Sequence, residues 1–358
     1  GKLNRLRRWY EALPQDLLVQ QPRLCLDYAW VLVNQGDKDA VEPYLQAAET
    51  AAHGAPETRS VTAIIRANNA RAFEDLPVMQ AEAVLALALI PPERAVARCT
   101  ALLQLGVVQL MSPAGDLAEA VRLLEETAVL ARQSQNMNSA LLAGGYLGLV
   151  HLLRGEVGEA TAVLQETHAF AAEQGLGQSP LLAYGHLGLA HLAFLAGEPD
   201  TARQEIAQLE THCRFANELS GLLRGTMLLA LVEQAAGSQA ALDSALADLA
   251  RTASVERAEG TASLKNPELS SQVAFFQEVL CQPNPSPAQL EMARLLAAGA
   301  SLATAQTQPV AAAPEQPLVD PLSERELEIL ALIAAGLKNK EPNVQLLGSD
   351  QIINVKGW

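Results

Sequence analysis

The chain has 358 residues, of which 49% are hydrophobic and only 4% aromatic, which is enough apolar material for a large core. With 40 acidic and 25 basic residues the formal net charge is −15, so the protein as a whole should repel nucleic acid and anionic membranes. The four cysteines show neither a CxxC pair nor a zinc-site spacing, which indicates reduced thiols, no metal site and a cytoplasmic location.

The N-terminal part predicts a short helix followed by two helical hairpins. Residues 1–27 hold an amphipathic helix whose apolar side carries Leu6, Trp9, Tyr10 and Leu13. Pro22 then begins a helix, at a position where its missing N–H costs nothing, and Gly36 turns the chain into a second helix. A less regular hairpin is predicted over 60–73 and 78–89.

The central part contains an internal repeat. Residues 141–152 read LLAGGYLGLVHL and residues 181–192 read LLAYGHLGLAHL, so nine of twelve positions are identical at a distance of forty residues. Turn glycines accompany the repeat at Gly115, Gly155 and Gly197, with spacings of 40 and 42 residues. A fixed period of this size is typical of helical repeat arrays, in which each unit buries its apolar face against its neighbours.

Other glycines extend this pattern. Gly36 and Gly237 are weaker copies of the turn glycine, while the turn expected near Glu74 has no glycine. Glycines also recur inside the predicted helices at equivalent positions, namely Gly106, Gly148 and Gly188. Because glycine in a helix costs roughly 1 kcal/mol relative to alanine, we expect these positions to permit close contact between helices.

The pattern therefore predicts an all-α fold, a right-handed superhelix of about seven tetratricopeptide-like helical hairpins over residues 1–305. Later hairpins are expected at 93–135, 138–174, 179–216 and 218–258, and a closing pair at 273–280 and 288–303.

The composition changes after the array. Residues 306–320 contain three prolines among alanine and glutamine, which is typical of a linker. A new helix starts in residues 321–341, where Ser323 and a glutamate three positions later form a capping box. Residues 342–358 form an atypical tail.

Residues 321–341, PLSERELEILALIAAGLKNKE, resemble the opening of a LuxR-type helix-turn-helix domain. The preceding array resembles the repeat domain of MalT-like, ATP-dependent LuxR-family transcriptional activators, in its period and in Trp9, Leu13-Pro14, Pro22-Arg23-Leu24 and Ala29-Trp30. In that family an NTPase module precedes a superhelix that receives the inducer, and a C-terminal LuxR domain binds DNA. The resemblance implies an effector-sensing and oligomerisation domain that binds a small-molecule inducer or a regulatory protein and can self-associate.

Two departures from the family pattern limit this expectation. The chain has no GxxxxGK[ST], so it should bind no cofactor itself, and ATP is expected only in an NTPase module upstream of residue 1. Pro342 stands where the family continues its second helix, and residues 342–358 contain nothing like its recognition helix. DNA binding is therefore expected only through a complete C-terminal domain that this chain does not contain.

Candidate ligand-binding residues lie on the first helix of several hairpins. Aromatic and imidazole rings that could stack on a sugar or peptide, or form a polar ladder, are Tyr146, His151, Tyr184, His186 and His191. Donors for a polar ligand are Arg66, Asn69 and Arg71. Core packing of the rings, and a solvated helix face for the donors, are the alternative interpretations.

The sequence therefore leaves two classes of function open. One is an inducer-binding sensor domain of a LuxR-family regulator, and the other is a repeat scaffold for protein–protein interaction without an inducer. No Ser/His/Asp, Cys/His or paired-carboxylate arrangement is present, so we expect no enzyme activity.

We predict that the chain does not bind DNA sequence-specifically, because the recognition helix is missing and residues 306–358 carry seven acidic against four basic groups. A gel shift at physiological salt should give no discrete complex. A complex that survives excess nonspecific competitor would contradict the prediction.

Overall fold

The computed structural model describes residues 2–72, 74–112, 114–216, 218–259 and 267–299. The predicted linker (306–320), the LuxR-like helix start (321–341) and the tail (342–358) lie outside these residues.

The described residues fold into consecutive helical hairpins, preceded by α1 (Lys2–Glu11) and α2 (Gln15–Gln20). The hairpins are α3 (Pro22–Asn34) with α4 (Val41–Ala51), α5 (Pro56–Ala72) with α6 (Leu76–Leu89), α7 (Ala95–Met111) with α8 (Leu117–Gln133), α9 (Met137–Leu153) with α10 (Val157–Glu173), α11 (Ala183–Leu195) with α12 (Pro199–Ala216), α13 (Leu219–Ala235) with α14 (Gln239–Glu259), and α15 (Pro267–Leu280) with α16 (Pro287–Ala298). Short 3₁₀ turns occur at η1 (Lys38–Ala40) and η2 (Pro180–Leu182). The predicted all-α class and the seven hairpins are confirmed, and no strand occurs in the part of the chain that the structure describes.

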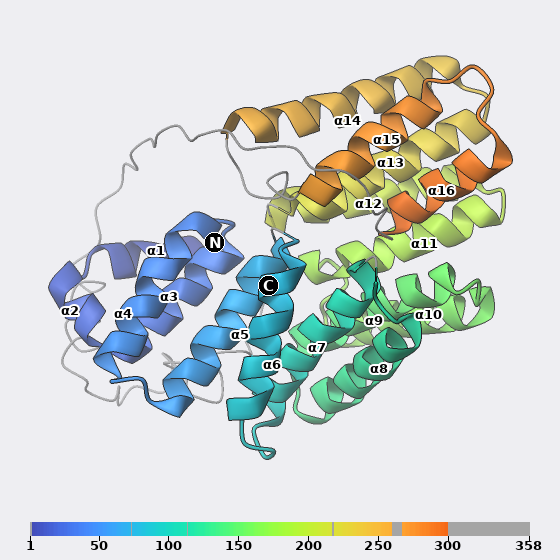
Figure 1. Cartoon of the computed structure of the whole chain (residues 1–358). Helices are drawn as coiled ribbons and strands as arrows, with labels where there is room; N and C mark the ends of the chain where they lie inside the picture. Colours follow the sequence, from blue (N-terminus) through green and yellow to red (C-terminus); the bar gives the residue numbers. More distant parts are fainter. Residues whose placement is uncertain (1, 73, 113, 217, 260–266, 300–358) are drawn as a thin grey trace.

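Successive hairpins stack side by side (Figure 1). The second helix of each hairpin up to α12 contacts the first helix of the next, and first helices also contact one another, so α11 packs against both α9 and α13. We call the surface formed by α9, α11 and α13 the A-helix face.

The predicted helix boundaries agree with the structure in the centre and differ towards the two ends. One helix was predicted before Pro22, but the structure has two, α1 and α2. Pro14 ends the predicted helix and is the N-cap residue of α2. Helix α5 begins at Pro56 instead of residue 60, and α16 ends at Ala298 instead of residue 303.

The turns between paired helices explain most of the recurring glycines. Gly36, Gly155, Gly197 and Gly237 have φ of 78°, 76°, 73° and 70°, the left-handed conformation that glycine adopts without steric cost. Glu74 occupies the turn without a glycine and nevertheless adopts the same conformation, with φ of 51°. This conformation carries a steric cost for a residue other than glycine, which His53 and Gln135 also bear, with φ of 51° and 56°.

The glycines inside the helices lie where neighbouring helices approach closely. A Cβ added at Gly106 would lie 2.8 Å from the Leu124 side chain. Leu164 of α10 fits between two glycines, since added Cβ atoms at Gly148 and Gly188 would lie 2.5 and 2.7 Å from it. The predicted packing role of these glycines is therefore confirmed, and Leu164 packs against both α9 and α11.

We predict that Gly148→Ala lowers the free energy of unfolding by about 1–3 kcal/mol, because the new methyl group overlaps Leu164. Chemical denaturation would measure the change. Gly158→Ala is the matched control, because Gly158 lies in helix α10 with open space around its Cα, and alanine there should stabilise the helix by up to about 1 kcal/mol. Equal effects of the two substitutions would contradict the packing role.

Candidate functional site

Four polar side chains from separate hairpins meet at the apolar core, where the two tyrosines are buried and Arg71 and Glu218 remain 15% and 11% exposed. Arg71 comes from α5, Tyr146 from α9 and Tyr184 from α11, and Glu218 is the N-cap residue of α13. The Arg71 guanidinium lies 3.3 Å from the Tyr146 hydroxyl and 3.7 Å from the Glu218 carboxylate. The Tyr184 hydroxyl donates to Glu218 at 3.3 Å, and the two tyrosine rings lie 4.4 Å apart. We call these four residues the polar centre.

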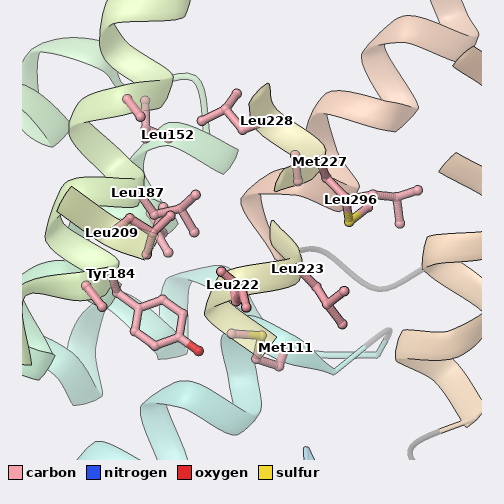
Figure 2. Close-up of a cluster of buried hydrophobic side chains, with 14 of the residues drawn as sticks. Met111, Leu152, Tyr184, Leu187, Leu209, Leu222, Leu223, Met227, Leu228 and Leu296 are labelled. Atoms are coloured by element: carbon pink, nitrogen blue, oxygen red, sulfur yellow. The ribbon is translucent and has the colours of Figure 1, made fainter. Parts of the chain in front are cut away.

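A second buried group lies in the same core. Arg224 of α13 is 1% exposed and forms an ion pair with Glu74, which stands in the turn between α5 and α6. Ser220 donates to the same carboxylate, and Arg224 Nη2 lies 3.5 Å from the sulfur of Met111. Figure 2 shows Met111 and Tyr184 in the same apolar cluster as Leu222 and Leu223 of α13. This group joins the second hairpin to the sixth.

Burial controls the electrostatics of both groups. Burial raises the pKa of Tyr146 and Tyr184 above the usual value of a phenol, so both hydroxyls are neutral at physiological pH. Burial acts in the opposite direction on the pKa of Arg71 and Arg224, but the nearby carboxylates and tyrosines outweigh it and raise the pKa of both. Two charged guanidinium groups therefore face two carboxyl groups inside the core.

The hydrogen bonding of the two arginines is incomplete. The Nε atoms of both Arg71 and Arg224 are buried and have no hydrogen-bond partner. An unsatisfied buried donor costs about 1–3 kcal/mol, more when the group is charged. These atoms are therefore free to donate to an acceptor oxygen that reaches them.

Three of the predicted ligand-binding residues, Arg71, Tyr146 and Tyr184, come together in the polar centre. Tyr146 is 0% and Tyr184 3% exposed, so both rings pack inside the helix array. In this structure the burial favours the core-packing interpretation of the two tyrosines, since a ligand could reach the rings only after neighbouring helices move.

The predicted histidines lie in three separate environments. His151 pairs with Glu156 in the turn after α9, at 2.7 Å, and His186 pairs with Glu205 of α12 at the same distance. His191 lies under α16, is 2% exposed and sits beside the main chain of Ala297. His151 and His191 are equivalent in the repeat but have different partners, so the structure does not place them in one ladder.

The remaining predicted donors connect the first two hairpins. Arg66 of α5 forms ion pairs with Glu42 and Glu49 of α4, at 2.9 and 2.7 Å. Asn69 donates to the main-chain oxygen of Lys38 at 3.1 Å. Both side chains therefore hold α5 against the first hairpin and lie apart from the polar centre.

Four residues of these two groups, Glu74, Glu218, Ser220 and Arg224, were not predicted from the sequence. Two signals point to the ion pair: Glu74 stands where the repeat calls for a glycine, and Arg224 is the one charged residue in the apolar run LSGLLRGTMLLAL. A cluster of rings between α10, α11 and α12, where the ring centroids of His168 and His212 lie 4.8 and 5.2 Å from that of His186, was not predicted either.

Among the described residues, no group of three or more His, Cys, Asp and Glu side chains is arranged to hold a metal ion. Within the same residues, every helix is too short or too polar to cross a membrane.

We predict that Glu74→Gly lowers the free energy of unfolding by about 3–5 kcal/mol, although glycine suits the left-handed backbone better. The substitution leaves Arg224 buried without its carboxylate partner. Gln135→Gly is the matched control, because exposed Gln135 has φ of 56° and the variant should stay within about 1 kcal/mol of wild type. A Glu74→Gly variant as stable as this control would contradict the role of the ion pair.

Neither a known protein family nor a curated protein matches the sequence. What the structure shows is therefore the architecture: the described residues form an all-helical protein whose helices pack as sequential hairpins.

Proposed function

We propose that the chain is the effector-sensing repeat domain of a LuxR-family transcriptional regulator and binds a small polar inducer at the polar centre. The observation that carries the proposal is the convergence of Arg71, Tyr146, Tyr184 and Glu218 from four hairpins on one point at the core. A ligand at this point touches hairpins two, four, five and six at once, so its binding energy can change how they pack together.

The chemistry of the site supports a ligand with acceptor oxygens and a flat or ring-shaped body. Small-molecule sites are mostly apolar with a few placed polar groups, and here two tyrosines, one carboxylate and a donor without a partner lie in an apolar core. The tyrosine rings suit a sugar or an aromatic ring, and Arg71 Nε would donate to a hydroxyl or carboxylate oxygen.

The expected partners follow from the resemblance to MalT-like activators. An upstream module would bind ATP, the domain would self-associate, and a complete C-terminal domain would bind DNA. Residues 321–341, which resemble the start of that domain, follow shortly after α16 in the chain. A change in the helix array would thus reach the DNA-binding part through α16.

A repeat scaffold for another protein is the second candidate. One observation favours it: α16 lies against α9, α11 and α13, so the A-helix face already accommodates a helix. A regulatory protein could present a similar helix to this face.

A thermal-stability screen of the full chain against neutral oligosaccharides, dicarboxylates and amino acids tests the inducer proposal. At a hundredfold excess over its Kd, a true ligand adds about 2.7 kcal/mol to the free energy of unfolding. We predict that Tyr146→Phe and Tyr184→Phe reduce this gain, because each removes a hydroxyl from the polar centre. Tyr28→Phe, a buried tyrosine of the first hairpin, is the control and should keep the full gain.

Tyr146→Ala separates ligand binding from packing. Loss of this fully buried ring should cost about 3–5 kcal/mol in either case. If affinity for the ligand found in the screen is unchanged in Tyr146→Ala and in both phenylalanine variants, these residues belong to the core only and the proposed site is wrong.

A further inference from the structure

The last hairpin departs from the regular order of the array. Helix α16 packs most extensively on α13, the first helix of the sixth hairpin. It also reaches α11 and α9, the first helices of the fifth and fourth hairpins. In a regular array the second helix of a hairpin does not lie across the first helices of earlier ones. Helix α16 therefore covers the A-helix face, as Figure 1 shows for its orange ribbon near α11 and α13.

The contact between α16 and the core consists of small side chains, the fully buried Leu296 and the half-buried Leu290. The fully buried residues of α16 are Ala293, Leu296 and Ala297, and Leu296 is the one large side chain among them. Figure 2 shows Leu296 beside Met227 of α13. Burial of alanine methyl groups, one leucine and part of a second removes little apolar surface from water compared with the long interfaces inside the array.

Two polar residues lie directly under α16. His191 sits beside the main chain of Ala297, and a Cβ added at Gly299, the C-cap, would lie 3.2 Å from Arg224 Nε. The positive guanidinium beside the helix C-terminus stabilises the docked position of α16 through the helix dipole. Met111 is the third neighbour, 3.6 Å from the same Cβ position.

The docked position also leaves polar atoms without partners. His191 Nε2 and Arg224 Nε are both buried with no hydrogen bond, and both side chains are at most 2% exposed. Undocking of α16 would let water reach these atoms and recover their hydrogen bonds. An element with a small apolar contact, and with unsatisfied groups beneath it, is expected to open at lower free energy than the rest of the fold.

We propose that α16 is a lid on the A-helix face, which opens as a unit while hairpins one to six stay folded. Opening uncovers His191, Arg224 and Met111, and it removes the cover from the side of the core that contains the Glu74–Arg224 ion pair. The lid is a property of this chain alone. The idea that opening of α16 admits an inducer rests on the proposed function.

Methionine oxidation of the full chain by dilute hydrogen peroxide tests the lid. Met111 and Met227 lie against α16 or its C-cap, at 4% and 0% exposure, and are protected while the lid is closed. Met79 of α6 is equally buried, at 0%, but lies outside the helices that α16 contacts, so it reports opening of the whole fold. Mass spectrometry of peptides should show Met111 and Met227 oxidised at least about tenfold faster than Met79.

A variant pair makes the test specific to α16. Leu296→Ala removes the one large side chain of α16 that is fully buried and should raise the oxidation rates of Met111 and Met227 by at least about tenfold while leaving Met79 unchanged. Leu45→Ala, a fully buried leucine of the first hairpin, is the matched control and should change neither of the two lid methionines relative to Met79.

The oxidation experiment tests the lid, and the ligand screen tests the inducer proposal. Equal oxidation of the three methionines in the wild type, or a parallel rise of all three in Leu296→Ala, overturns the lid. Failure of the ligand screen overturns the proposed inducer function and leaves the oxidation result valid.

Discussion

The buried ion pair between Glu74 and Arg224 is the interaction on which the arrangement of the array depends. It joins the turn of the second hairpin to the first helix of the sixth, across 150 residues of sequence. A charged pair in an apolar core is costly unless both partners are present, so each residue forces the other to stay in place. The strained left-handed backbone of Glu74 fits this account, because the turn gives up the local preference for glycine in exchange for a distant charge partner.

The polar centre and the ion pair bring four charged side chains and two tyrosines to a core that is otherwise apolar. Such a core is specific to one packing of the hairpins, because a shift of one helix would separate donors from acceptors. A ligand that bound there would have to favour a different packing, and its effect would equal the difference in its affinity for the two arrangements. Helix α16 could move without separating any of these pairs, since it touches Arg224 and His191 without pairing with a carboxylate of the core.

The two most similar repeats show how one scaffold carries different interactions. Leu164 packs between Gly148 and Gly188, so the close helix contacts repeat with the sequence. The positions that differ do not repeat: Tyr146 lies in the polar centre, while its equivalent, His186, contacts two other histidines and Glu205. The glycines thus set the spacing of the helices, and the variable positions between them determine the chemistry at each level of the array.

The sequence alone determined the local features of this protein: the helical class, the number of hairpins, the turns at Gly36, Gly155, Gly197 and Gly237, and the packing glycines. These features could be predicted because they depend on the backbone and on contacts between neighbouring helices, which a period of about forty residues records directly. The sequence also identified Arg71, Tyr146 and Tyr184 as notable, but grouped them with Arg66 and His151, which lie elsewhere. Only the tertiary structure decided which polar residues meet, because pairs such as Glu74 with Arg224 and His191 with Ala297 lie 150 and 106 positions apart and leave no periodic signal. It also decided that α16 lies across the A-helix face, since contacts of one helix with the first helices of several earlier hairpins leave no periodic signal in the sequence.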